Sequence, residues 1–126
     1  MPASFDYTVI RVVPRVEREE FINAGVVVFC LEKRYLAAHI HLDESRLKAL
    51  WPEIDVSLVR EHLNAIERIC AGDAAGGPIA KLSQRERFHW LSSARSTIIQ
   101  PSPVHTGICD ETGNLLERLA KQFLSA

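Results

Sequence analysis

Polar side chains of types that could bind a ligand are concentrated in one late stretch of the chain. This stretch contains Arg95, Thr97, Gln100, Ser102, His105 and Thr106. Asp110, just beyond it, is expected to begin a helix, and free N–H groups at a helix N-terminus favour an anion. The stretch is therefore either a binding loop on a rigid scaffold or a proline-stiffened loop whose polar groups satisfy one another. Asp110 argues against an anion, because its carboxylate would occupy that helix end.

Three arginines form a second candidate site, because guanidinium groups gathered on one face can clamp an anion. Arg11 lies in an expected strand, Arg18 in the charged turn after it, and Arg95 in the late stretch. The alternative is that Arg18 and its acidic neighbours form a solvated turn whose ion pairs each contribute little. Arg11 sits in mid-strand, so we expect a specific partner for it.

Two histidines, His39 and His41, alternate along an expected strand and so project from one side of it. This spacing suits two metal ligands, and Asp43 or His105 could add a third. No spacing in the sequence fixes that third ligand, and histidines on a solvent face explain the pattern equally well. We therefore predict no metal and no other cofactor.

His105 also lies near two nucleophilic side chains, Ser102 and Cys109. A base beside a nucleophile is the arrangement of covalent catalysis, but such pairs are defined by geometry. No nucleophile-elbow or protease signature surrounds these residues. We expect structural roles for them and lean against an enzyme.

The elements that must position these side chains begin with three strands. Residues 5–13 are rich in β-branched and aromatic side chains and stop at Pro14. Residues 25–31 form a continuous apolar run, which is typical of a strand covered on both faces, so we place this strand inside the sheet. Residues 35–42 alternate in polarity and complete a hairpin with it.

The turn before the central strand and the end of the sheet each have a distinctive residue pattern. Asn23 and Gly25 are expected to tolerate positive φ at a bulge or a turn before the central strand. A fourth strand is predicted at residues 96–100. The following residues 101–103, Pro-Ser-Pro, are expected to leave the sheet and emerge into solvent, because proline cannot donate to the ladder.

Helices are predicted from caps and from three- and four-residue apolar spacing. Their expected first residues are Asp43, Asp55 or Ser57, Ser83 with Glu86 as a capping box, and Asp110. In the third of these helices, an exposed Trp90 beside His89 and Phe88 would mark a protein interface. The elements together predict one α+β domain over residues 1–126, with a mostly antiparallel sheet of about four strands packed with three or four helices.

Composition and charge exclude several classes of protein. A hydrophobic content of 47% in 126 residues indicates one folded domain, and a net charge of -1 provides no strong field for nucleic acid or acidic membranes. The longest apolar stretch, residues 24–31, is too short to span a bilayer, and no signal peptide is evident. Three cysteines without a Cys-x-x-Cys pair are expected to be buried thiols in the reducing cytoplasm.

Two segments carry a family resemblance. They are residues 7–29, YTVIRVVPRVEREEFINAGVVVF, and residues 87–110, RFHWLSSARSTIIQPSPVHTGICD. In these segments the chain resembles a bacterial family catalogued as domain of unknown function 3037, and the similarity covers nearly the whole chain. No activity is established for that family, so the resemblance implies no catalytic residue. Its members are often encoded near a HipA-like serine/threonine kinase, which implies a kinase partner in a toxin–antitoxin-like setting.

We therefore expect a non-catalytic binding or regulatory module that acts through a protein partner. The chain lacks the Gly-rich loop and His-Arg-Asp signature of a kinase, so it would be the partner of the enzyme. Self-association into a homodimer is also compatible with the sequence. The runner-up is a small enzyme or a nucleotide- or anion-binding protein that uses the loop from Arg95 to His105, which requires a pocket there. Nucleic-acid binding ranks third.

Overall fold

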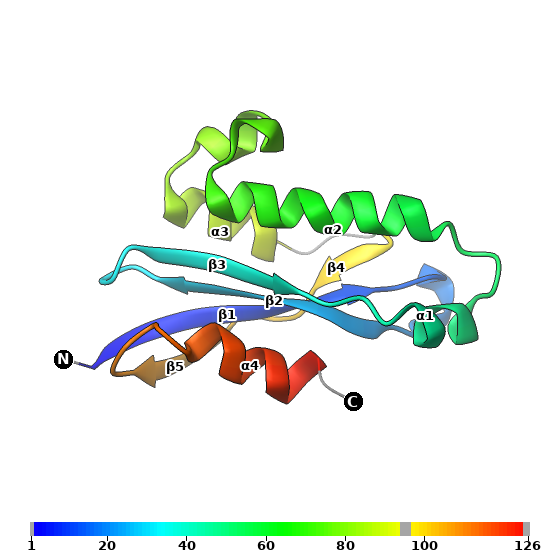
Figure 1. The fold of residues 1–126 in the computed structure, drawn as a ribbon, viewed down its shortest axis with the longest axis horizontal. Coiled ribbons are helices and arrows are strands. Elements are labelled where there is room, and N and C mark those ends of the chain that lie inside the picture. The colour runs from blue at the N-terminus through cyan, green and yellow to red at the C-terminus, as the bar shows by residue number, and fades with distance from the viewer. Residues whose placement is uncertain (1, 94–96, 125–126) are drawn as a thin grey trace.

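The computed structural model describes residues 2–93 and 97–124, which form a five-stranded sheet with helices on both faces (Figure 1). The strands are β1 (Ala3–Val12), β2 (Ile22–Cys30), β3 (Tyr35–Ile40), β4 (Ile99–Pro101) and β5 (His105–Cys109). Their order is β3-β2-β1-β4, and β5 also pairs with β1; all pairs are antiparallel. The predicted α+β class and the interior position of the valine-rich strand are confirmed.

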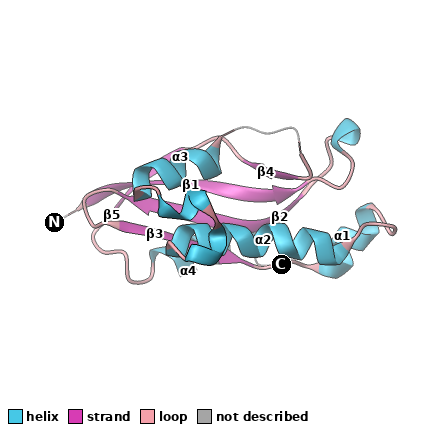
Figure 2. Ribbon diagram, turned by 90° about the horizontal axis from the view of Figure 1, so that it is seen from above, coloured by secondary structure: helices cyan, strands magenta, loops and turns pink. Residues whose placement is uncertain are grey.

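Helices cover the sheet unequally (Figures 1 and 2). The α-helices are α1 (Glu44–Leu50), α2 (Val56–Ala71), α3 (Gln84–Ser92) and α4 (Leu115–Leu124), and the 3-10 turns are η1 (Val16–Arg18), η2 (Ala74–Gly76) and η3 (Pro78–Lys81). In Figure 1, α2 and α3 lie above the sheet and α4 lies below it. None of the helices among the described residues combines the length and apolarity needed to cross a membrane.

Local sequence signals explain where the first three helices begin. Asp43 accepts a hydrogen bond from the Arg46 N–H, and Asp55 accepts one from the Leu58 N–H. Ser83 and Glu86 form the predicted capping box at the start of α3. The expected helix start at Asp110 is wrong, because α4 begins five positions later, at Leu115. The residues expected to form a loop before it instead extend the sheet as β5.

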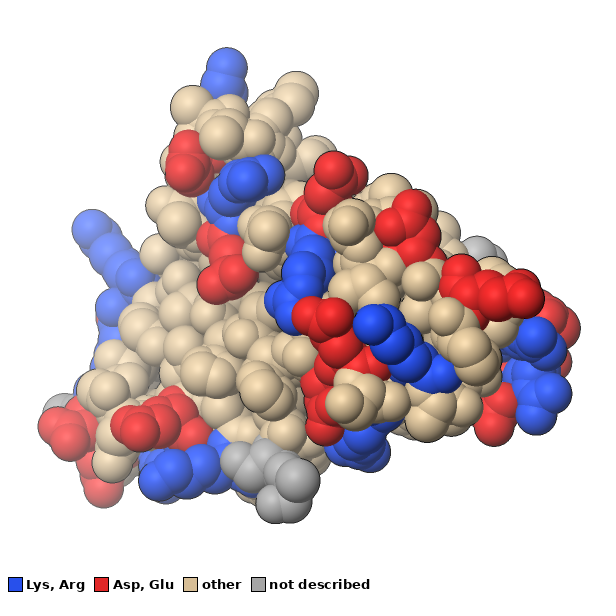
Figure 3. Space-filling view, turned by 45° about the vertical axis from the view of Figure 1, so that its right-hand side comes forward, with Lys and Arg blue, Asp and Glu red and all other residues tan. Residues whose placement is uncertain are grey.

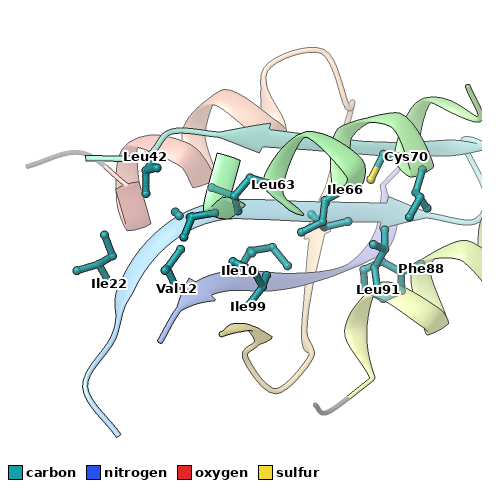
Figure 4. Packing of buried hydrophobic residues seen from close by; sticks show 14 of the residues in the cluster. Ile10, Val12, Ile22, Leu42, Leu63, Ile66, Cys70, Phe88, Leu91 and Ile99 are labelled. Atoms are coloured by element: carbon teal, nitrogen blue, oxygen red, sulfur yellow. The ribbon is translucent and has the colours of Figure 1, made fainter. Parts of the chain in front are cut away.

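Alternation along β2 divides the interior into two cores. The larger core, which we call the main core, lies beneath α2 and α3 and includes Val27 and Phe29 of β2 (Figure 4). The second core lies beneath α4 and includes Val26 and Val28. All four side chains are at most 5% exposed, so β2 is covered on both faces as its unbroken apolar sequence requires.

The register of β1 against β2 shifts between Ile10 and Arg11, which confirms the predicted bulge. The backbone at this bulge does not adopt the positive φ that we expected. Among the described residues, positive φ occurs at Glu19, Arg34, Gly72 and Gly77, and not at Asn23 or Gly25. At position 25 a Cβ would lie 2.6 Å from the Ile40 Cδ1 atom and 3.3 Å from the His39 carbonyl oxygen, so the Ile40 side chain would have to move to admit a larger residue.

Candidate functional site

Ser102, a central residue of the late polar stretch, is built into the sheet edge. Its N–H donates to the Val9 carbonyl at 2.8 Å, and its Oγ accepts the Val9 N–H at 2.8 Å. The hydroxyl of Thr8 donates to the Ser102 carbonyl, also at 2.8 Å. Ser102 is 4% exposed, so it does not enter solvent as expected, whereas Pro103 after it is exposed. The serine hydroxyl replaces a ladder acceptor where the chain kinks between two prolines.

Thr97 and Gln100 make hydrogen bonds within their own segment. The Thr97 Oγ1 donates to the Ile99 carbonyl, and the Gln100 Nε2 donates to the Thr97 carbonyl, both at 2.8 Å. Arg95, which was expected to act with them, lies outside the described residues. These bonds bend the chain into β4 and give both side chains structural partners.

His105 and Thr106 lie on opposite faces of β5, because consecutive strand residues point in opposite directions. The His105 ring contacts the Tyr7 ring, with 5.4 Å between their centroids, on the α4 side. The Thr106 Oγ1 donates to the Asp6 Oδ1 at 2.8 Å, and Asp6 borders a hollow on the α3 side. The sheet therefore separates the two polar side chains that the sequence places next to each other.

The two described arginines of the expected clamp have intramolecular contacts. The Arg18 Nε lies 2.5 Å from the Glu20 Oε1, an exposed ion pair of the kind anticipated for the charged turn. The Arg11 guanidinium lies over the Phe21 ring, 4.4 Å from its centroid. The Arg11 Nε atom is buried and has no hydrogen-bond partner among the described residues. An aromatic face is thus the partner that we expected for Arg11.

His39 and His41 lie on the α4 side of β3, as their alternation predicts. They border a hollow of about 280 Å³ together with Glu117, Ala120, Lys121 and Leu124 of α4. The described residues contain no group of three His, Cys, Asp or Glu side chains that could hold a metal ion. The Lys121 ammonium at the same hollow would repel a cation.

A different set of residues forms a concave surface between α2 and α3. The α2–α3 cleft has a volume of about 300 Å³ and lies between α2, Trp90 and the approach to β4. Its lining comprises His62, Ala65, Ile66, Ile69, Trp90, Thr97, Ile98 and Ile99. The side chains are mostly apolar, and His62 and Thr97 provide the polar groups. Such a surface favours an apolar or aromatic group.

Two further hollows lie along α3, of which the first shares Trp90 with this cleft. The outer α3 hollow, of about 450 Å³, is lined by Leu82, Arg85, Glu86, His89, Trp90 and Ser93. The α3–β1 hollow, of about 320 Å³, is lined by Asp6, Phe29, Arg85, Phe88, His89, Ser92 and Val104. Trp90 thus borders two of the three concavities, and Arg85 and His89 also border two. We call these three concavities together the α3 surface.

The position of α3 depends on a buried arginine that the sequence did not single out. The Arg87 Nη1 donates to the Ile69 and Cys70 carbonyls at 2.8 and 2.9 Å, and its Nε donates to the Leu82 carbonyl at 3.0 Å. Arg87 therefore satisfies the last carbonyls of α2, where the helix dipole also favours a cation. This link fixes α3 against the C-terminal end of α2.

The cysteines do not provide a reactive thiol at this surface. Cys30, Cys70 and Cys109 are all free and buried. Burial raises the pKa of the Cys70 thiol to about 12, against a smaller lowering by Arg87. At neutral pH this thiol is protonated and behaves as a small apolar side chain.

Sequence reasoning found part of the α3 surface. Trp90 is 39% exposed and Phe88 is buried, which is the arrangement that we expected to mark an interface. The contributions of His62 and of residues 97–99 could not be found, because they depend on how α2 and β4 meet.

Comparisons with known proteins agree with the resemblance. A family model described as "Protein of unknown function (DUF3037)" matches residues 7–124. No curated protein and no solved structure matches the chain.

Proposed function

The chain belongs to the DUF3037 family, and we propose that it is a non-catalytic binding or regulatory module that acts through a protein partner. The observation that supports this proposal is the half-exposed Trp90 where two concavities of the α3 surface meet. Tryptophan is enriched among the residues that dominate binding energy at interfaces. Its large apolar area and rigid ring lose little conformational entropy on binding.

The surroundings of Trp90 resemble the organisation of a protein interface. Leu82, on the same side, is 37% exposed, so the apolar area extends beyond one residue. Arg85 and His89 lie beside it, and polar residues at the rim of an apolar centre help to exclude water from it. Because Glu86 accepts hydrogen bonds from Ser83 in the capping box, Arg85 is the charged group of the outer α3 hollow best placed to meet a partner.

The hydrogen bonds of the late stretch support a module without catalysis. The Ser102 hydroxyl is engaged with Val9, and the Thr106 hydroxyl is engaged with Asp6. A nucleophile must instead lie beside a base and face its substrate. A loop enzyme would need these side chains to converge on one pocket, whereas the sheet distributes them over two faces.

The partner that we propose is a HipA-like serine/threonine kinase in the cytoplasm of a bacterium. This assignment comes from the family resemblance, and the buried free cysteines are compatible with a reducing compartment. The α3 surface would supply the contact, with Trp90 inserted into the partner and Arg85 paired with an acidic group at the rim.

Calorimetric titration of this chain with a HipA-like serine/threonine kinase, at micromolar concentrations, tests the proposal. Trp90→Ala should weaken binding about 30-fold or more, which corresponds to about 2 kcal/mol at an interface centre. Leu58→Ala is the matched control, because Leu58 is 44% exposed near the start of α2 and lies outside the α3 surface. Its affinity should equal that of the wild type.

A second variant separates a binding defect from a folding defect. Arg85→Glu changes an exposed side chain and should reduce the rate of association while the melting temperature stays unchanged. The proposal fails if no complex forms, or if Trp90→Ala binds the kinase as tightly as Leu58→Ala does.

A further inference from the structure

The two open edges of the sheet differ in how well they are protected. Exposed edge strands offer unpaired N–H and C=O groups to other chains, and proteins guard them with charges, prolines and bulges. At one edge, Pro101 and Pro103 flank the kink that separates β4 from β5. At the other edge, β3 pairs with β2 in an uninterrupted register, and residues 35–42 include no Lys, Arg, Asp, Glu or Pro.

The direction of the backbone groups in β3 follows from one hydrogen bond. The His41 N–H donates to the Ala24 carbonyl at 2.8 Å, so His41 faces β2. Residues of an antiparallel strand alternate between facing the paired strand and facing away from it. With the observed register, Leu36, Ala38 and Ile40 therefore direct their N–H and C=O groups toward the open edge.

The same alternation leaves fewer outward-facing N–H and C=O groups on the protected edge. The Ser102 N–H bond to the Val9 carbonyl shows that Val9 faces β4 and β5. The register then turns Thr106 and Ile108 outward in β5, and the prolines prevent this row from continuing. β3 is consequently the edge with the longer unbroken row of available groups.

We propose that two copies of this chain associate as a two-fold dimer by antiparallel pairing of their β3 strands. A two-fold axis through Ala38 pairs Ala38 with its own counterpart and Leu36 with the partner's Ile40. This register uses every outward residue of β3 on both chains, and a shift in either direction leaves some of them unpaired.

The side chains on both faces of the seam are compatible with this register. On the α2 side, Leu36 would meet the partner's Ile40, which extends the main core across the seam. On the α4 side, His41 would meet the partner's Tyr35. That ring would reach the hollow of about 280 Å³ that His39, His41 and α4 border. The hollow thus has a specific occupant in the second copy.

Charge does not oppose the association. Figure 3 shows a broad area without Lys, Arg, Asp or Glu on the side of the molecule that β3 borders. At the hollow that His39 and His41 border with α4, Glu117 and Lys121 lie one helical turn apart. Their opposite signs allow two antiparallel copies to present unlike charges to each other.

Sedimentation and light scattering over a concentration series test the dimer. The wild type should be dimeric at about 100 µM, within the range of modest protein interfaces. Ala38→Pro removes an outward N–H without removing a bond to β2, and it should raise the dimer dissociation constant about 100-fold or more. Ile108→Pro is the matched control, because it removes an outward N–H from the opposite edge and should leave the dimer unchanged.

Hydrogen exchange of the unmodified chain provides a test that needs no variant. The amides of Leu36, Ala38 and Ile40 should be protected at high protein concentration and exchange rapidly on dilution, whereas the Ile108 amide should exchange equally in both. A monomer at every concentration would overturn the proposal. A dimer that Ile108→Pro dissociates and Ala38→Pro does not would place the contact at the wrong edge and overturn it as well.

Discussion

Replacing Ser102 distinguishes a structural role from a chemical one. A structural role predicts that Ser102→Ala lowers the free energy of unfolding, and a free nucleophile predicts that it does not. The Ser102 Oγ accepts the buried Val9 N–H at 2.8 Å, and Ser102→Ala removes this acceptor. A buried donor left without a partner costs about 1–3 kcal/mol. The carbonyl and N–H of residue 102 keep their bonds to Thr8 and Val9, so the loss should stay within that range.

Urea denaturation followed by circular dichroism measures this loss. Ser102→Ala should lower the midpoint with an unchanged m-value, and the melting temperature should fall by about 3–10 °C. Ser93→Ala is the control, because the exposed Ser93 Oγ donates to the His89 carbonyl at 2.7 Å and water can replace it. Its effect should stay below about 0.5 kcal/mol.

A double-mutant cycle that combines Ser102→Ala with Thr8→Val measures the coupling between these two side chains. The Thr8 Oγ1 donates to the Ser102 carbonyl and also lies 3.3 Å from the Ser102 Oγ, so the two substitutions should be non-additive by about 0.5 kcal/mol or more. The reasoning is refuted if Ser102→Ala leaves the free energy of unfolding unchanged. A serine free to act as a nucleophile would give that result.

Two further predictions concern the junction of α2 and α3. Arg87→Met should destabilise the fold by about 1.5–3 kcal/mol, because the buried bonds to the Ile69 and Cys70 carbonyls and the part-buried bond to the Leu82 carbonyl lose a charged donor. Urea denaturation measures this loss against the exposed Arg85→Met as control, and equal effects would contradict the role of Arg87. For Cys70, burial raises the thiol pKa in the folded state to about 12. Its contribution to stability is complete below the unfolded pKa of about 8.5 and is lost as pH rises from there toward the folded value. Between pH 8 and 10 the free energy of unfolding should therefore fall less steeply for Cys70→Ala than for the wild type, by up to about 1.4 kcal/mol per pH unit. Parallel curves of the free energy of unfolding against pH would show that the thiol does not contribute.

The proposed partner contact and the proposed dimer contact use different parts of the fold. The α3 surface is formed by α2, α3 and the segments leading into and out of β4, whereas the dimer seam is the β3 edge. A two-fold dimer through β3 would therefore present two α3 surfaces. Ala38→Pro should leave the intrinsic affinity of each α3 surface for the kinase unchanged, and Trp90→Ala should leave the dimer intact.

The sequence by itself determined the elements whose signals are local. The unbroken apolar run of β2 can be buried on both faces in the middle of a sheet, and Asp43, Asp55 and the Ser83–Glu86 pair supply hydrogen-bond acceptors to the first turns of α1, α2 and α3. Each of these signals acts within a few residues, so it does not depend on what lies across the fold.

Only the tertiary structure decided what happens in the late polar stretch. Proline chemistry predicted that residues 101–103 leave the sheet, but Thr8 and Val9, more than ninety positions earlier, hold Ser102 in place. Once that edge is fixed, β5 continues it and sends His105 and Thr106 to opposite faces. The α3 surface is likewise made where α2, α3 and β4 converge. Such contacts join residues far apart in the chain, and periodicity and capping patterns contain no information about which distant segments will meet.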